Sequence, residues 1–420
     1  MSEPAGAEAP ARGEISGGRL GAIFLTVFLD LLGFGLVMPL LPRYAHTLHA
    51  SSLQIGLLGA AYSGMQFVFV PLWGRLSDRV GRRPVLLGSI FASIFAMAML
   101  GFAQSLAWLF IARLFGGIAT ANIATAQAYI ADTTTKEARA RGMGLIGMAF
   151  GLGFIFGPFF GGILSRHDVG LPAKVAAGLA VVNFAWAWRS LPESLPRELR
   201  ERNAKRPKQR LKIGIDVGAL SRTFAIPGLG VTIVLFFIVV LSFSNLEQTF
   251  ALLANDEFGL DSQQTGYVLG AVGVVGAGVQ GGLIGPLSRR FGEIRLIRTG
   301  TFLQGAAFAM IALAVGRSSI LFYVASVVLA AGQGLTNPSL TTLASKRAPP
   351  ELQGGSLGVM QSMGALARVL GPTWGGLIYD YGHRLPYVTG ATGLFGACVL
   401  AFSLRHRQGE ASPAGGSQGA

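Results

Sequence analysis

The chain has 420 residues, of which 51% are hydrophobic and 13% are charged, and its mean hydropathy is +0.53. Soluble proteins carry about 25% charged residues, so this composition excludes an ordinary soluble domain and indicates a protein of many membrane-spanning helices. The net charge is +14. The single cysteine, Cys398, excludes an internal disulfide and a thiolate metal site.

Twelve apolar segments follow one another along the chain. A long basic linker, 192–222, separates an N-terminal six-helix bundle (20–191) from a C-terminal one (223–404). The polar ends, 1–19 and 405–420, are expected to be disordered cytoplasmic tails. The expected membrane segments are 20–44, 53–73, 84–104, 106–130, 141–165, 172–191, 223–253, 263–287, 294–315, 319–342, 353–379 and 384–404.

Lysine and arginine are distributed unevenly around these segments. If both termini are cytoplasmic, the cytoplasmic segments hold 26 of the 34 basic residues and the opposite face holds 5. This bias predicts a multi-pass protein of the inner (cytoplasmic) membrane with both termini in the cytoplasm. Topology and contact with lipid headgroups account for the basic linker, so no nucleic-acid partner is expected.

The two halves repeat each other in sequence. GRLSDRVGRRP at 74–84 matches GPLSRRFGEIR at 285–295 with an offset of 211, and 137–164 matches 351–378 with an offset of 214. The second match aligns a Gly-Pro pair and a Gly-Gly pair in each half. A parallel repeat of six helices predicts two pseudo-symmetric bundles with a binding site between them, near the middle of the membrane.

Four motifs occur in the predicted helices and loops. They are Gly74-Arg75-Leu76-Ser77-Asp78-Arg79-Val80-Gly81-Arg82-Arg83-Pro84 after the second helix, Leu109-x-x-x-Arg113-x-x-x-Gly117 in the fourth, Gly153-x-x-x-Gly157-Pro158-x-x-Gly161-Gly162 in the fifth and Asp30-x-x-Gly33-x-Gly35-x-x-x-Pro39-x-Leu41-Pro42 in the first. With these motifs, the chain resembles the major facilitator superfamily over about residues 20–404. Within it, the chain is most similar to the twelve-helix drug/proton antiporters of the tetracycline-efflux-like branch. The resemblance implies an all-α polytopic membrane protein with twelve transmembrane helices in two pseudo-symmetric six-helix bundles.

The resemblance also implies a conformational gate in the 74–84 loop. In the family, this loop clamps the cytoplasmic ends of the two halves when the cavity faces outward, with Asp78 near the start of helix 11. The excess of basic residues that is usual in cytoplasmic loops explains the arginines of this loop, but it does not explain Asp78 or the glycines at 74 and 81. The second copy has Arg289 at the position of Asp78, so that clamp is expected to be degraded. The implied gate residues are Gly74, Asp78, Arg79, Gly81, Arg82 and Arg83.

The fifth-helix motif is similar to one that is typical of antiporters rather than symporters. Its residues are Gly153, Gly157, Pro158, Gly161 and Gly162. Small residues at these spacings let helices pack closely, and the proline bends a helix or frees a carbonyl group. Two interpretations remain open: close packing alone, or a sealed helix that prevents ion leak during exchange.

Four ionisable residues lie inside predicted membrane segments: Asp30, Arg113, Glu247 and Arg368. Such a group costs about 2.5–3.5 kcal/mol at a helix centre on insertion scales, and it indicates a functional site. A purely structural ion-pair network is the alternative. We predict Asp30 and Glu247 as proton-coupling acids and Arg113 as the charge partner of one of them. Arg368 is a candidate for binding substrate anions or for pairing with Glu247.

Further polar side chains fall mostly on the predicted helices 4, 7 and 10, which line the central cavity in the superfamily together with helix 1. They are predicted to line the substrate cavity: Gln127, Asn245, Gln248, Gln333, Asn337, Gln361 and Arg368. The sequence departs from the tetracycline exporters because it has no acid in the third helix and only Gln304 in the ninth. Tetracycline itself is therefore not the expected substrate.

We predict a secondary active transporter that exports a small amphipathic compound or drug in exchange for protons by alternating access. The alternatives are a proton symporter or uniporter of an organic anion or polar nutrient and, more remotely, a non-transporting membrane receptor or scaffold. We expect no enzyme activity, no metal (His46 and His49 have no third ligand nearby) and no cofactor. A proton gradient would supply the energy. The expected partners are a small-molecule substrate, protons and the lipid bilayer, and a monomer is expected.

Overall fold

Nearly all of the described chain is helical. The computed structural model describes residues 17–119, 122–134, 136–205, 221, 223–349 and 352–404. These residues contain helices and no strand. Among them, ten helices are long and apolar enough to cross a membrane. The predicted all-α, multi-pass membrane fold is therefore confirmed.

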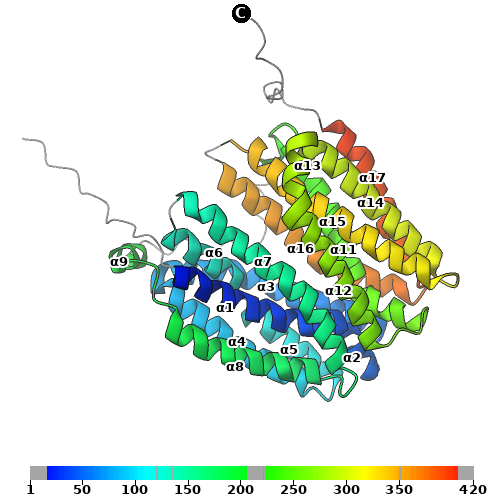
Figure 1. Cartoon of the computed structure of the whole chain (residues 1–420), viewed down its shortest axis with the longest axis horizontal. Helices are drawn as coiled ribbons and strands as arrows, with labels where there is room; N and C mark the ends of the chain where they lie inside the picture. Colours follow the sequence, from blue (N-terminus) through cyan, green and yellow to red (C-terminus); the bar gives the residue numbers. More distant parts are fainter. Residues whose placement is uncertain are drawn as a thin grey trace, which may run out of the picture.

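The helices of the first half run back and forth between the two ends of a bundle (Figure 1). They are α1 (Gly17–Val37), the 3₁₀ turn η1 (Met38–Leu40), α2 (Leu41–Thr47), α3 (Ser52–Val80), α4 (Arg82–Gly101), α5 (Leu106–Ala119), α6 (Asn122–Thr133), α7 (Lys136–Leu164) and α8 (Leu171–Ser190).

The second half repeats this arrangement. Its helices are α11 (Leu229–Asp256), α12 (Ser262–Gly278), the π-helical stretch η2 (Val279–Leu283), α13 (Ile284–Phe291), α14 (Glu293–Ala314), α15 (Ser319–Arg347), α16 (Gln353–Tyr379), α17 (Leu385–Leu400) and the 3₁₀ turn η3 (Ala401–Ser403). A short helix between the halves, α9 (Arg197–Lys205), was not predicted from the sequence.

Two predicted segments, 106–130 and 353–379, are not among the ten spans. They are helical nonetheless, since the first corresponds to α5 with α6 and the second to α16. Their membrane crossing stays a prediction. The predicted tails lie outside the described residues, except that α1 already begins at Gly17.

The first predicted segment is not one continuous helix. α1 ends at Val37, and the 3₁₀ turn η1 separates it from α2. Pro39 is the second residue of η1 and Pro42 is the second residue of α2. Proline has no N–H and its ring clashes with the preceding turn, so the hydrogen-bond ladder is interrupted at this point.

Corresponding helices of the two halves begin in the same way. Ser51 precedes α3 and Asp261 precedes α12, and each side chain accepts a hydrogen bond from the N–H of the glutamine three residues later. These glutamines, Gln54 and Gln264, accept in return from the N–H of the capping residue. Such capping boxes satisfy donors at an open helix end. The sequence repeat therefore extends to the helix starts.

The two bundles meet at two helix crossings, α3 with α16 and α7 with α12. At each crossing, a glycine lies against a carbonyl group of the opposite helix. A Cβ on Gly56 would overlap the oxygen of Pro372, and a Cβ on Gly266 would overlap the oxygen of Pro158. Because these residues correspond in the repeat, the same close crossing occurs twice, related by the pseudo-two-fold axis.

Polar pairs join the halves at one end of the molecule, which carries the α2–α3, α7–α8 and α11–α12 connections and is called the far end. There, Ser52 donates to Asp380 (2.5 Å), and Arg166 donates to Gln263 (2.6 Å). Each hydrogen bond connects an N-half helix or loop with its C-half neighbour. The far end is therefore closed.

The halves separate toward the opposite end, called the basic end, which carries segments 74–84 and 285–295 (Figure 1). Gly74, Gly147, Gly281 and Gly358 lie on the basic-end portions of α3, α7, η2 and α16. No atom of a neighbouring helix lies within 4 Å of the Cβ position of these glycines. The structure is therefore closed at the far end and open at the basic end.

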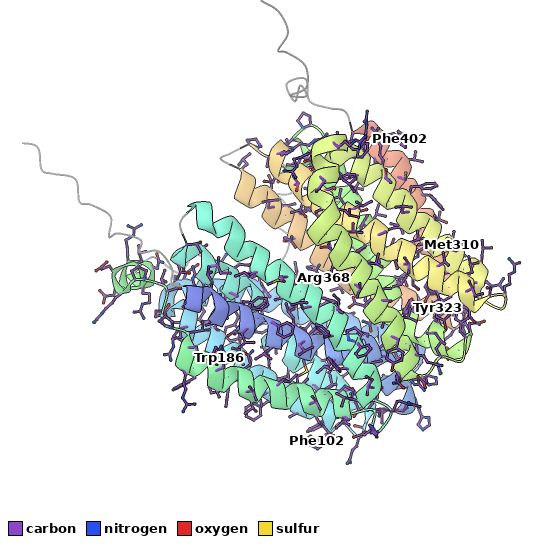
Figure 2. The ribbon with its side chains drawn as sticks, viewed as in Figure 1. Phe102, Trp186, Met310, Tyr323, Arg368 and Phe402 are labelled. Atoms are coloured by element: carbon purple, nitrogen blue, oxygen red, sulfur yellow. The ribbon has the colours of Figure 1, made fainter. Side chains whose placement is uncertain are left out.

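The outer surface is apolar. Figure 2 shows Phe102, Trp186, Tyr323 and Phe402 on the periphery of the two bundles, and all four side chains are exposed. A folded soluble protein rarely exposes large apolar surfaces. This periphery is the surface that a membrane protein presents to lipid.

Candidate functional site

Arg113 on α5 lies in the interior, with 3% of its surface exposed. Its Nε donates to the carbonyl oxygen of Leu58 on α3 (3.4 Å), and its guanidinium carbon lies 4.0 Å from the centre of the Tyr62 ring. The face of an aromatic ring attracts a cation. The two helices can approach because Gly117, one turn after Arg113, has no side chain; a Cβ there would crowd the backbone of Tyr62.

An acid of the second half acts on the same arginine. Glu247 on α11 interacts electrostatically with Arg113 of the N-terminal half and with Arg368 on α16. Figure 2 shows Arg368 in the region where the bundles converge. The neighbour of Glu247, Gln248, packs against Gly59 of α3. One acid and two bases, drawn from both halves, therefore share the interior of the interface.

Besides Asn245, three predicted cavity residues carry buried acceptors. The side-chain oxygens of Gln248, Gln333 and Asn337, like that of Asn245, have no hydrogen-bond partner among the described residues. Gln333 and Asn337 lie one turn apart on α15. A buried acceptor without a partner is destabilising by about 1–3 kcal/mol, so these oxygens are available to a donor from water or from a bound compound.

The remaining predicted cavity residues have different surroundings. Gln127 on α6 and Gln361 on α16 are exposed. Asn245 is buried inside the C-terminal bundle, where its Nδ2 donates to the carbonyl oxygen of Pro386 at the start of α17 (2.8 Å). Asn245 thus connects two helices of one half, although it is only two positions from Glu247.

Asp30 lies half-buried on α1, in the N-terminal half. The next residue, Leu31, packs against Gly153 of α7. Phe34, one turn after Asp30, lies against the Tyr62 ring, with 5.9 Å between the ring centroids. The same Tyr62 ring contacts Arg113. The two predicted acids therefore lie in different halves, and the charge of Arg113 acts on Glu247.

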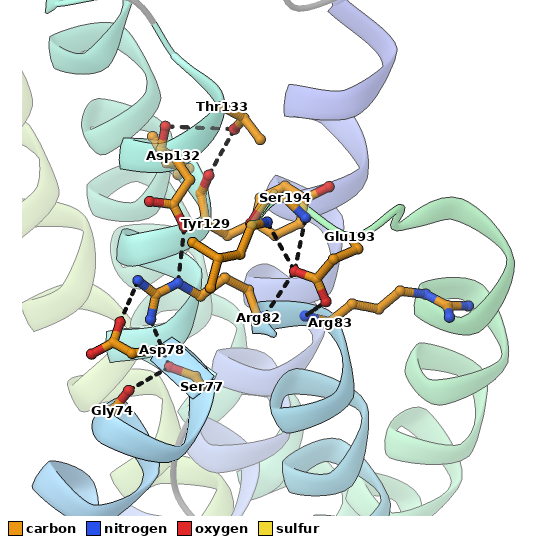
Figure 3. Close-up of polar contacts among 12 residues, drawn as sticks. Gly74, Ser77, Asp78, Arg82, Arg83, Tyr129, Asp132, Thr133, Glu193 and Ser194 are labelled. Carbon is orange, nitrogen blue, oxygen red and sulfur yellow. Dashed lines mark hydrogen bonds and ion pairs between the residues drawn. The ribbon is translucent and has the colours of Figure 1, made fainter. Parts of the chain in front are cut away.

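Arg82 is the centre of a network at the basic end (Figure 3). It is the first residue of α4, and its guanidinium group contacts Asp78 (2.6 Å), Asp132 (2.9 Å) and the hydroxyl oxygen of Ser77 (2.7 Å). Ser77 in turn donates to the carbonyl oxygen of Gly74 (2.7 Å). These contacts join the end of α3, the start of α4 and the end of α6.

The start of the linker is attached to the same network. Glu193 accepts hydrogen bonds from the backbone N–H groups of Arg82 (2.9 Å) and Arg83 (3.3 Å). The side chain of Arg83 donates to the carbonyl oxygens of Leu191 and Trp188, both at 2.7 Å. The predicted contact of Asp78 with the start of helix 11 stays a prediction, because residues 350 and 351 lie outside the described part of the chain.

The fifth-helix motif faces two neighbours. Gly153, Gly157 and Gly161 recur every fourth residue on α7, and each lies against the backbone of α1. Pro158 and Gly162 lie on another face and form the crossing with α12. One motif therefore holds α7 to its own bundle and to the other bundle.

Three contributors were not predicted from the sequence: Tyr62 beneath Arg113, and the acids Asp132 and Glu193 that surround Arg82. A signal existed for Tyr62, which is the single tyrosine of segment 53–73. The two acids lie just beyond the ends of predicted membrane segments. Their partners come from other helices, so only the tertiary structure reveals their role.

Comparison with known proteins identifies the class of this transporter-like fold. The sequence model of the Major Facilitator Superfamily matches residues 23–372. The chain therefore belongs to the Major Facilitator Superfamily, a family of membrane transporters.

Several similar proteins are named for drug resistance. The chain is 30% identical to tetracycline resistance protein class B of Escherichia coli, over 91% of this chain and 92% of the relative. It is 31% identical to multidrug resistance protein 1 of Bacillus subtilis, over 88% and 91%.

Solved structures resemble the chain over most of its length. The human organic anion transporter MFSD10 (TETRAN) has a TM-score of 0.68 and 26% identity, over 94% of this chain and all of that one (100%). An inward-facing bacterial homologue of the lysosomal transporter Spinster has a TM-score of 0.72 at 16% identity, over 91% of this chain and 95% of that one. The second likeness concerns the fold alone.

Proposed function

We propose that this transporter exports a small amphipathic compound in exchange for protons by alternating access, with Glu247 as a proton-carrying acid and Arg113 as its charge partner. The observation that carries the proposal is the interaction of Glu247 with arginines of both halves. Protonation of Glu247 removes its attraction to Arg113, which belongs to the other bundle. Proton binding and the relative positions of the bundles then depend on one electrostatic interaction, so they are thermodynamically linked.

Substrate binding acts on the same interaction. A compound between the halves changes the solvation of Glu247 and its distance from Arg113, and a buried charge that loses the influence of its opposite charge is destabilised. The occupied site and the ionised site therefore influence each other, as coupled exchange requires. The unpaired oxygens of Gln248, Gln333 and Asn337 would accept hydrogen bonds from the compound. Asp30 would provide a second proton site in the N-terminal half.

The charge bias suggests the orientation. If the basic end faces the cytoplasm of a bacterial-type inner membrane, this conformation receives a compound from the cytoplasm. Both termini would then be cytoplasmic. A proton gradient would supply the energy, so no cofactor and no enzyme activity would be needed. The transporter would act as a monomer. The network around Arg82 would hold the basic end when the cavity faces outward.

The efflux relatives support export. Tetracycline resistance protein class B and multidrug resistance protein 1 both match nearly the whole chain. The third predicted helix nevertheless lacks an acid, and Gln304 occupies the ninth. Glu247 lies outside the usual tetracycline-exporter pattern. We therefore propose a lipophilic compound other than tetracycline as the substrate.

A second candidate function is proton symport or uniport of an organic anion. The charges near Glu247 favour this function. Two bases, Arg113 and Arg368, act on this one acid, so the group carries a net positive charge that would attract an anion. With Glu247 protonated, the two guanidinium groups would attract a carboxylate or sulfate. The similarity to a human organic anion transporter supports the same idea. The two candidates differ in the direction of the proton relative to the substrate.

Proteoliposomes with an internal pH dye distinguish the candidates. Outward gradients of a lipophilic cation, a neutral drug and an organic anion are imposed in turn. In exchange, protons move against the direction of the compound; in symport, they follow it. Transport without any proton movement would contradict both coupled schemes and leave a uniporter.

Variants test the assignment of the acid. Glu247→Gln should abolish uphill accumulation (a drop of at least about tenfold) while substrate–substrate counterflow persists, because counterflow needs no proton release. Asp30→Asn is measured beside it. Glu257→Gln, an acid at the far end of the same helix, is the matched control. If Glu247→Gln and Asp30→Asn both accumulate the compound at the native rate, the assignment is wrong.

A further inference from the structure

A groove at the basic end lies between α9 and the end of α3. It is lined by Arg79, Val80, Arg197, Arg200 and Glu201 and has a volume of about 430 Å³. That volume is within the range of small-ligand sites. Three guanidinium groups and one carboxylate give the groove a positive charge, which suits an anion.

The groove is built from anchored elements. Asn203 on α9 donates to the backbone oxygen of Asp78 at the end of α3 (3.1 Å). Glu193, shortly before α9, accepts from backbone N–H groups at the start of α4 and from those of Ser194 and Leu195. The segment before α9 and the end of α9 are therefore both attached to the N-terminal bundle, which fixes the backbone of Arg197 and Arg200.

Arg200 differs from its neighbours on α9. Its Nε is covered from solvent and has no hydrogen-bond partner among the described residues, so a ligand in the groove reaches this donor only when the Arg200 side chain turns outward. Arg197, by contrast, pairs with Glu201 (3.0 Å) and keeps 85% of its side chain exposed. A buried N–H of a charged group without an acceptor is strongly unfavourable. Phosphate oxygens are the acceptors that a guanidinium group binds best, through two parallel hydrogen bonds.

Apolar side chains border the arginines. Val80 lines the groove, Leu76 lies one turn earlier on α3, and Leu199 lies on α9; all three are exposed. α3 is a membrane-spanning helix that ends at Val80. This is the arrangement that an amphiphile needs, with a charged head at the membrane boundary and chains along the helix. A soluble phosphate would gain nothing from the exposed apolar side chains.

We propose that this groove binds the phosphate group of an anionic phospholipid, with Arg200 as the principal ligand and Arg79 and Arg197 beside it. The bound lipid would attach α9 and the 74–84 segment to the membrane leaflet at the basic end. The proposal does not depend on the direction of transport or on the substrate.

Native mass spectrometry of the full chain tests this site. The protein is titrated with phosphatidylglycerol in a neutral detergent, and phosphatidylcholine serves as the uncharged reference. One phosphatidylglycerol should bind more tightly than phosphatidylcholine. Arg200→Gln should weaken it about five- to tenfold, since a basic group near an anionic lipid contributes roughly a factor of five. Arg202→Gln removes the same charge from the same helix outside the groove and should change binding less than about twofold.

A second variant keeps the test valid if Arg200→Gln does not fold. Arg197→Gln changes a mostly exposed side chain, so the fold should persist, and binding should weaken about two- to fivefold. Equal losses for the Gln variants at 200, 197 and 202 would indicate general attraction to a basic surface and would overturn the proposal. Inorganic phosphate and glycerol phosphate are tested as competitors. If either displaces phosphatidylglycerol at millimolar concentration, the ligand is a soluble phosphate and the lipid assignment is wrong.

Discussion

The turn after α3 and its counterpart after α13 have similar backbones and opposite charges. Gly81 (φ +114°, ψ 158°) and Gly292 (φ +75°, ψ 159°) each join two helices in a conformation that is essentially restricted to glycine. Both turns lie at the basic end, and they are related by the sequence repeat. The backbone of the turn is therefore retained in both halves.

The side chains around the turns keep their positions but exchange their charges. Ser77 contacts Arg82 (2.7 Å), and Ser288 contacts Glu293 (3.0 Å), in each case across the glycine. In the first half, Arg82 pairs with Asp132 at the end of α6 (2.9 Å). In the second half, Glu293 pairs with Lys346 at the end of α15 (2.8 Å). Asp132 and Lys346 are themselves 214 positions apart, which is the offset of the repeat.

The charge of the residue at the helix start, Arg82 in the first half and Glu293 in the second, decides how many oppositely charged partners it needs. A helix N-terminus carries a partial positive charge, so Glu293 at the start of α14 is favourable there. Arg82 at the start of α4 is unfavourable, and its guanidinium group pairs with two acids, Asp78 and Asp132, while Glu193 accepts from its backbone N–H. A sequence repeat can therefore retain the position of an ion pair, while the sign of the charge at the helix start sets how many residues join the network.

The largest expected effect is at the glycines. Gly81→Ala should lower the free energy of unfolding by about 3 kcal/mol, because alanine is strained at this φ and ψ and its Cβ would overlap the carboxylate of Glu193. Gly292→Ala should lower it by about 1–2 kcal/mol from backbone strain. Thermal unfolding in detergent measures both. If the two variants lower the melting temperature equally, the overlap with Glu193 at Gly81 has no effect on stability.

The next largest effect is at the arginine network. Asp132→Asn should lower the free energy of unfolding by about 2 kcal/mol, less than for a fully buried pair because Asp78 still faces Arg82. The double exchange Arg82→Glu with Asp132→Lys should not restore stability, since Asp78, which pairs with the Arg82 guanidinium, would then face a second carboxylate. The matched exchange in the second half, Glu293→Lys with Lys346→Glu, should recover about half of the single-variant loss, since the helix dipole opposes it.

The same double variants can contradict the difference between the Arg82 and Glu293 networks. If the double exchange in the first half is as stable as the one in the second half, the number of acids around Arg82 has no consequence. Thermal unfolding of the four single variants and the two doubles gives the coupling free energy of each pair.

The smallest expected effect is at the exposed cation. Lys346→Gln should change the free energy of unfolding by at most about 0.5 kcal/mol, because an exposed lysine contributes little to an ion pair and its side chain is 47% exposed. Glu293 keeps Ser288 and the start of α14 as partners. A melting temperature that falls as far as for Asp132→Asn would rule out the proposed asymmetry between the two halves.

The membrane helices could be predicted because they depend on local composition. A span requires about 20 apolar residues, and segment 53–73 lies within the observed α3. The helix continues into the basic residues because a helix can extend beyond the apolar core of a membrane. Helix α9 was not predicted, since its nine residues carry no apolar periodicity. It is held by its contact with α3 and by Glu193, which precedes it and binds the start of α4.

Glu247 and Arg113 could be selected individually, because an ionisable group in an apolar run indicates a functional site. Their interaction could not be predicted, since they are 134 positions apart and belong to different bundles. Asn245 looks equivalent in the sequence but bonds to Pro386 within its own half. Residues two positions apart on a helix point to different sides, and only packing decides which side faces the interface.

Composition and chain order specify the helices, the repeat and the ionisable residues in apolar segments, so these features could be read from the amino-acid sequence alone. Only the packing of the helices closes the far end and brings Arg113 and Glu247 near enough to interact electrostatically. It also decided that Arg82 and Glu293 have oppositely charged networks. These features arise where helices distant in sequence approach each other, and the approach depends on glycines meeting carbonyl groups across the two crossings.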